Sequence, residues 1–100
     1  MEQFQKQQTR LPRRKTKEPN KRKVIVLNDD VTTFDFVTRM LVQIFFMEED
    51  EARRTTNAID QNGSAVVGVY PVDIAKSKAE AGMAMARAEN FPLRITTEDV

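Results

Sequence analysis

The chain has 100 residues, of which 40% are hydrophobic, so it can form one small domain with a modest core. It contains neither cysteine nor histidine, which excludes disulfides, thiolate sites and the commonest general base and metal ligand. The net charge of +1 is unevenly divided, because residues 1–23 carry nine Lys and Arg against two Glu, whereas residues 24–100 carry seven bases and thirteen acids.

Residues 1–22 are predicted to form a disordered basic N-terminal extension. This segment is poor in apolar residues, with Phe4 and Leu11 almost alone. It cannot bury enough surface to offset the entropy of ordering the chain. The folded domain is therefore predicted over residues 23–100.

The domain is predicted to open with a strand followed by a helix. The run KVIVLN at residues 23–28 contains the continuous β-branched and aliphatic stretch VIVL, a pattern typical of a strand buried on both faces. The two aspartates that follow should end the strand. Thr32 and Asp35 form a T-x-x-D helix-start signal, and the apolar residues keep helical spacing as far as Phe45.

A second helix is predicted at about residues 48–61, with four acids in the first turn, where the helix dipole favours them. Gly63 suits the left-handed position that ends a helix. The run AVVGVY at residues 65–70 then predicts a strand, in which Gly68 indicates a bulge or a close backbone approach.

Pro71 is suited to the first turn of a third helix, which should run to about residue 89. This helix is rich in alanine and contains Gly82, so it can lie close against a sheet. Residues 93–96 alternate and predict a last strand. The order β-α-α-β-α-β predicts a small α+β fold, with a three-stranded antiparallel sheet packed with three helices.

The acidic pair Asp29-Asp30, at the end of the first strand, admits three interpretations. It can be a turn, since Asn and Asp side chains bond their own backbone and cap the next helix. It can be part of a magnesium pocket, although the later strands end in Tyr70 and Thr96, without a further aspartate. It can also bind a cation, with Asp29 facing an ammonium and Asn28 accepting a hydrogen bond from it.

A family resemblance bears on this choice. Residues 23–96 resemble the ClpS adaptor family in their order of motifs: VIVLNDD, T-x-F-x-FV, a helix ending in QIFF, AVVGVYPVDIAKSK and FPLRIT. The resemblance implies that Asn28 and Asp29 bind the α-amino group of a substrate and that Asp30 supports the same rim. The family usually completes this amine site with a histidine, and Asp60 stands at that position here.

The resemblance also implies a hydrophobic pocket for the first side chain of the substrate and a surface that docks on the protease. The pocket would be lined by Leu27, Thr32, Phe34, Val37, Thr56, Ile59 and Leu93. The family usually has methionine at the positions of Phe34 and Thr56. The docking surface would include Asp73 and Lys78 on the third helix. From spacing alone, the apolar members of this set are core residues and Lys78 is a solvated base.

The function implied is that of a non-enzymatic adaptor, which binds the free α-amino group and large hydrophobic first side chain of N-degron substrates and delivers them to a Clp AAA+ unfoldase. The expected partners are the N-terminal domain of a ClpA-type or ClpC-type unfoldase and peptides that begin with Phe, Leu, Tyr or Trp. We expect a monomer without cofactors, metals or bound nucleic acid.

We also expect a bacterial cytoplasmic protein, because no apolar run approaches the roughly 20 residues of a transmembrane helix and no secretory signal is recognisable. The alternative function is nucleic-acid binding through the basic N-terminal extension. The nine bases within residues 1–23 could support salt-dependent phosphate contacts. Against this, the remainder of the chain is acidic.

Overall fold

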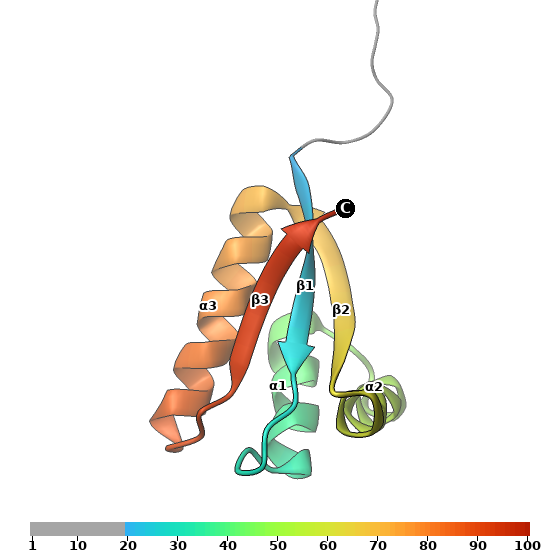
Figure 1. Ribbon diagram of the computed structural model, residues 1–100, viewed down its shortest axis with the longest axis vertical. Coiled ribbons are helices and arrows are strands. Elements are labelled where there is room, and N and C mark those ends of the chain that lie inside the picture. Colours follow the sequence, from blue (N-terminus) through green and yellow to red (C-terminus); the bar gives the residue numbers. More distant parts are fainter. Residues whose placement is uncertain (1–19) are drawn as a thin grey trace, which may run out of the picture.

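The computed structural model describes residues 20–100 and confirms the predicted order of elements (Figure 1). The elements are β1 (Lys21–Leu27), α1 (Phe34–Phe45), α2 (Glu49–Asn62), β2 (Ser64–Pro71), α3 (Val72–Ala88) and β3 (Arg94–Asp99). The largest boundary difference is at β3, which continues to Asp99 instead of ending near Thr96. The predicted N-terminal extension lies almost wholly outside the described residues.

The three strands form one antiparallel sheet in the order β2-β1-β3, with β1 in the centre. Val24 and Val26 of β1 are fully buried, whereas the residues that alternate with them are only half-buried. The helices lie on one side of the sheet (Figure 1), so the expectation that β1 is buried on both faces is wrong. An unbroken aliphatic run does not separate a two-sided strand from a one-sided strand with an apolar open face.

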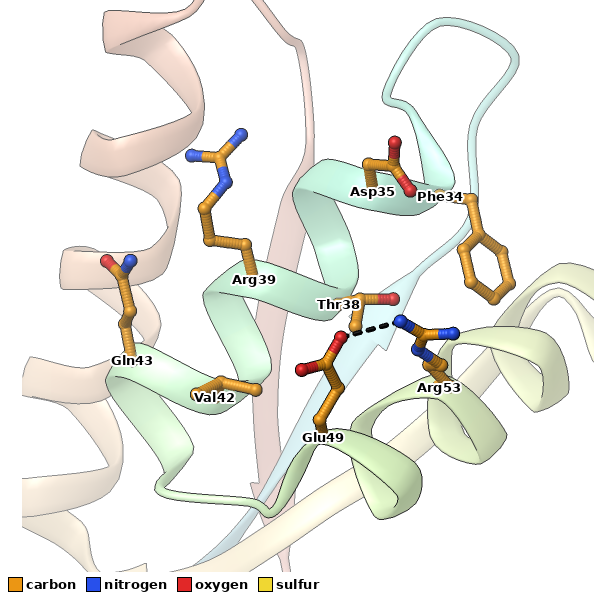
Figure 2. A pocket seen from close by; sticks show the side chains of 8 residues that line it. All are labelled: Phe34, Asp35, Thr38, Arg39, Val42, Gln43, Glu49 and Arg53. Atoms are coloured by element: carbon orange, nitrogen blue, oxygen red, sulfur yellow. Dashed lines mark hydrogen bonds and ion pairs between the residues drawn. The ribbon is translucent and has the colours of Figure 1, made fainter.

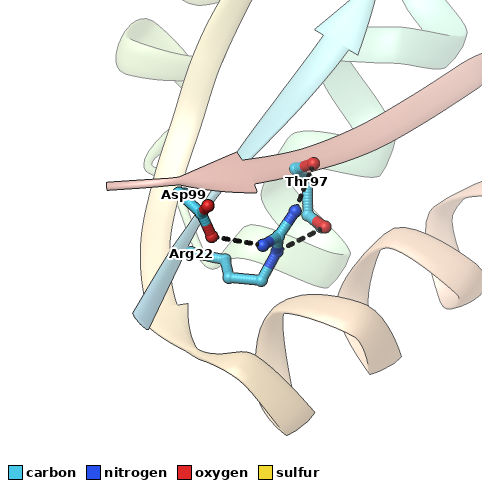
Figure 3. A network of polar contacts seen from close by, with 3 residues as sticks. All are labelled: Arg22, Thr97 and Asp99. Atoms are coloured by element: carbon cyan, nitrogen blue, oxygen red, sulfur yellow. Dashed lines mark hydrogen bonds and ion pairs between the residues drawn. The ribbon is translucent and has the colours of Figure 1, made fainter. Parts of the chain in front are cut away.

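The N-terminal end of β1 is tied to β3 by the side chain of Arg22 (Figure 3). Its Nε donates to Oγ1 of Thr97 at 2.9 Å, and its Nη2 donates to the Thr97 carbonyl oxygen at 2.8 Å. Its Nη1 pairs with Asp99 Oδ1 at 2.6 Å. These contacts explain why the strand begins at Lys21, two residues before the predicted start.

The helix boundaries follow local capping chemistry, with one correction. The N-cap of α1 is Thr33, whose hydroxyl oxygen accepts a hydrogen bond from the amide of Phe36 at 3.2 Å. Thr32, the predicted start signal, is instead bonded to Asp29. At the C-terminal end of α2, Gly63 has the predicted left-handed conformation, with a φ of 90°, and its amide donates to the Ile59 carbonyl oxygen.

Two glycines allow close packing around the sheet. The pairing of β1 with β2 shifts register between Val24 and Ile25, opposite Gly68, which confirms the predicted bulge. A Cβ on Gly82 would lie 2.6 Å from Cδ1 of Ile95, so α3 sits close against β3 as expected. No helix within residues 20–100 is long and apolar enough to cross a membrane.

Candidate functional site

The loop after β1 is folded around the carboxylate of Asp29. Its Oδ1 accepts hydrogen bonds from the amides of Val31 at 2.8 Å and Thr32 at 2.7 Å, and its Oδ2 accepts one from the Thr32 hydroxyl at 2.7 Å. Asn28 anchors the start of this loop, since its amide donates to the Gly63 carbonyl oxygen at 2.9 Å. The turn interpretation of the acidic pair is therefore realised by Asp29.

The same contacts act on the ionisation of Asp29. Partial burial raises its pKa, but the hydrogen bonds from Thr32 and Val31, together with the charge of Arg87, outweigh burial and bring the pKa below its ordinary value of 3.8. Asp29 is accordingly a carboxylate at neutral pH. Asp30 is exposed and makes no hydrogen bond or ion pair with any residue in the described part of the chain, so its carboxylate is available to a ligand.

A stability measurement separates the two aspartates. Asp29→Ala should lower the free energy of unfolding by about 1 kcal/mol at neutral pH, because three hydrogen bonds to a half-exposed carboxylate are lost. Asp30→Ala should change it by less than about 0.5 kcal/mol. Since the folded-state pKa of Asp29 is lowered, its contribution is present above pH 3.8 and is lost as the pH falls below that value. Urea unfolding of both variants at neutral and acidic pH checks this. Equal stability losses would mean that Asp29 does not hold the loop.

A small cavity lies beside this loop, at the N-terminal end of α1 and the C-terminal end of α2. Its volume is about 30 Å³, and it is lined by Asn28, Thr32, Thr33, Phe34, Val37, Thr56, Ile59 and Asp60. That space is enough for one or two water molecules but not for a large side chain. Phe34 is 44% exposed at the first position of α1. Its ring is the most exposed of the large apolar side chains that line the cavity.

The structure thus brings together seven of the eleven residues predicted for the amine site and the pocket. The other four are Leu27, Asp29, Asp30 and Leu93. Leu93 is 1% exposed and belongs to the core. Leu27 alternates with the buried Val24 and Val26, so it lies toward the open face of the sheet.

Most of the hydrogen-bonding capacity of the Thr56 hydroxyl is already used within the protein, so little of it is available to a ligand in the cavity. Its hydroxyl donates to the Ala52 carbonyl oxygen at 2.8 Å and accepts a hydrogen bond from the Thr38 hydroxyl at 2.9 Å. Both threonines are buried. One lone pair of the Thr56 oxygen remains as an acceptor.

A larger groove adjoins the cavity, and sequence analysis did not find it. The groove has a volume of about 430 Å³. It lies between α1 and the start of α2, with Phe34 at one end (Figure 2). It carries both charge signs, since Arg53 pairs with Glu49 at 2.6 Å and Arg39, which pairs with Glu89 at 2.7 Å, lies along its wall. Phe34 lines the groove and the cavity alike. Outward movement of its ring would join the two spaces.

Asp73 and Lys78 lie together at a separate site. They line an open hollow of about 420 Å³ between the C-terminal end of α1 and α3, together with Gln43, Ile44, Phe46, Ile74, Ser77 and Ala81. Lys78 is not a solvated base, because its Nζ donates to the Ile44 carbonyl oxygen at 2.6 Å. The cavity is at the other end of α1, and a helix of twelve residues is about 18 Å long.

Comparisons with known proteins agree with this architecture. Residues 17–96 match the family described as ATP-dependent Clp protease adaptor protein ClpS. The ClpS adapter of Nautilia profundicola is 48% identical over 82 residues, which cover 82% of this chain and 84% of that protein. The adapter of Campylobacter jejuni strain RM1221 is 45% identical over 89 residues, which cover 89% and 93%.

A solved structure is also similar, that of Agrobacterium tumefaciens ClpS2 bound to L-phenylalaninamide. It has a TM-score of 0.80 and 42% sequence identity, and the match covers 83% of this chain and 100% of that one. The class defined by these matches is that of protease adaptors, which are distinct from the protease itself. The chain belongs to the ClpS family.

Proposed function

We propose that this adaptor binds the free α-amino group and the large hydrophobic first side chain of N-degron substrates and delivers them to a Clp AAA+ unfoldase in the bacterial cytoplasm. The observation that carries the proposal is the cavity between α1 and α2, where the polar side chains of Asn28 and Asp60 meet the apolar ones of Phe34, Val37 and Ile59.

The polar half of the cavity suits an ammonium. A free α-amino group has a pKa of about 8, so at neutral pH it is mostly charged, with three donors and no acceptor. Asn28 and Asp60 offer acceptors, and Asp30 adds an unpaired carboxylate in the adjoining loop. Asp60 lies in the last turn of α2, where the helix dipole disfavours an acid. A cationic ligand would compensate that unfavourable position.

The apolar half suits one large side chain. Phe34 would move outward to admit it, and burial of a Leu or Phe side chain contributes about 1.5–3 kcal/mol. L-phenylalaninamide, the molecule in the solved ClpS2 structure, combines a free α-amine with a benzyl side chain. Its chemistry therefore matches both halves of the cavity in this chain.

Delivery requires a second surface that stays free when the first is occupied. The hollow with Asp73 and Lys78 meets this requirement, since it lies at the opposite end of α1 from the cavity. We assign it to the N-terminal domain of a ClpA-type or ClpC-type unfoldase. Nucleic-acid binding is not favoured, because residues 20–100 carry thirteen acids against ten bases.

A panel of peptides that differ only in residue one tests this function. Peptides beginning with Phe, Leu, Tyr or Trp should bind about 10-fold to 100-fold more tightly than those beginning with Ser, Glu or Lys, which corresponds to burial of one large side chain. Fluorescence anisotropy with labelled peptides measures this. A flat profile across the panel would contradict the proposal.

A further inference from the structure

The residue with positive φ that follows α1 is an aromatic residue, whereas glycine and asparagine have positive φ near the ends of the other two helices. In each case a residue with positive φ lies at the C-terminal end: Gly63 at 90° after α2, Asn90 at 64° near the end of α3, and Phe46 at 59° after α1. Glycine and asparagine are the residues that normally occupy this left-handed conformation. An aromatic residue with a Cβ is unfavourable there.

Burial does not explain the choice of phenylalanine. The Phe46 side chain is 79% exposed, the most exposed large hydrophobic residue of the described chain. The turn itself is closed by the backbone, because the amides of Phe46 and Met47 both donate to the Leu41 carbonyl oxygen. A glycine would make the same turn without strain. The aromatic residue therefore has a backbone cost in the isolated domain that burial of its ring does not offset.

The ammonium of Lys78 packs against one face of the Phe46 ring. Its Nζ lies 4.5 Å from the centroid of the Phe46 ring, 5.3 Å from that of Tyr70 and 5.7 Å from that of Phe45. The same Nζ donates to the Ile44 carbonyl oxygen at 2.6 Å, so it also neutralises the C-terminal end of α1. Lys78 makes no ion pair with any residue within 20–100. Its charge is directed at the end of α1 and at the rings.

The surroundings of the ring fit a protein partner. Phe46 lines the open hollow of about 420 Å³, and the exposed Ile74 and the acid Asp73 line the same hollow. An exposed aromatic ring with an apolar side chain and charged groups at its edge is the arrangement of an interface anchor. The chain belongs to a family of Clp protease adaptors, and the proposed delivery function requires a surface for the unfoldase, so we take the unfoldase as the occupant of this hollow.

We propose that Phe46 is the aromatic anchor of the docking surface, that it inserts into an apolar hollow of the Clp unfoldase, and that Lys78 is a positioning residue acting through Phe46. Asp73 faces a basic group of the partner. The inference rests on the proposed delivery function and adds the residue on which docking depends.

The decisive variant is Phe46→Gly, because it removes the ring and relieves the backbone at once. The melting temperature should stay the same or rise, while affinity for the Clp unfoldase of the same organism falls about 30-fold, the loss typical of an interface anchor. Phe46→Ala should lose as much affinity without any gain in stability, and it provides a second variant if the first folds poorly. Asn90→Gly is the matched control and should change neither quantity.

The role of Lys78 is tested by a double-mutant cycle. Lys78→Met keeps an unbranched side chain among the rings but removes the charge, and it should weaken unfoldase binding in the parent chain. In the Phe46→Gly background it should have no further effect, since its action passes through the ring. Additive losses would overturn the positioning role.

The measurements distinguish the two levels of the proposal. If the parent chain does not bind the unfoldase, both the proposed delivery function and the proposed role of Phe46 are contradicted. If Asp73→Asn weakens binding but Phe46→Gly does not, the docking surface stands and the anchor is overturned. Binding of a Phe-first peptide should be unchanged in all these variants, because the cavity is at the other end of α1.

Discussion

A Phe-first peptide with an acetylated N-terminus is expected to bind at least about 100-fold more weakly than the same peptide with a free one. Acetylation replaces an ammonium that has three donors by a neutral amide that has one. Hydrogen bonds to charged groups contribute roughly 1.5–3 kcal/mol each, so the loss of two accounts for this factor. For the free peptide, affinity should also fall as the pH rises through about 8, where the ammonium loses its proton. The acetylated peptide should show no such dependence.

Isothermal titration calorimetry of both peptides across this pH range makes the measurement. Asp60→Asn provides the matched variant, because it keeps the shape of the side chain and one acceptor oxygen but removes the charge. The variant should bind the free peptide more weakly and the acetylated peptide with unchanged affinity, so that the difference in affinity between the two peptides becomes smaller. Equal affinities for the two peptides in the parent chain would contradict the proposed amine site.

The elements of the fold were predictable because their signals are local. Helical spacing, the acids in the first turn of α2 and Gly63 at its end each act within a few residues. Gly68 was similarly informative, since a Cβ there would lie 2.5 Å from the Tyr70 ring, two residues along the same strand. The candidate cavity was predictable only in part, and through the family resemblance, because core and pocket residues have the same spacing.

The remaining features depend on contacts between distant segments or on competition between neighbours. Thr32 and Thr33 are equivalent candidates for a helix cap in sequence, and the carboxylate of Asp29 decides between them by binding Thr32. Thr38 pairs with Thr56 across two helices. Nothing in the sequence around Phe46 distinguishes it from a core aromatic, since its exposure follows from a left-handed φ.

The second large effect is expected at Phe34, which we predict to select against β-branched first residues. In the parent chain, a Val-first or Ile-first peptide should bind at least about 10-fold more weakly than a Leu-first peptide. Val and Ile carry two heavy atoms on Cβ and have a stiff χ1, so their bulk lies at the mouth of the cavity, where the Phe34 ring leaves little space. Leucine branches at Cγ, one atom further from the backbone, so its branch would lie past the mouth of the cavity.

Phe34→Ala should reduce this discrimination to less than about 3-fold. Removal of the ring joins the cavity of about 30 Å³ to the groove of about 430 Å³, so the mouth no longer excludes a branched Cβ. Affinity for the Leu-first peptide should fall at the same time, because the ring that covers the bound side chain is lost. The Phe34 side chain is half-exposed, so the free energy of unfolding should change by only about 1 kcal/mol.

Two further variants make this result specific. Phe34→Met substitutes a flexible side chain of similar length and should give intermediate discrimination, since methionine adapts its shape to its neighbours. Val31→Ala alters an exposed residue of the loop after β1 that does not line the cavity. It should leave the ratio of Leu-first to Val-first affinity unchanged. If Phe34→Ala kept the full preference for Leu over Val while remaining folded, the mouth of the pocket would have to be formed by other residues. Val37 would then be the first to test, because it is the branched side chain one helical turn further along the same wall.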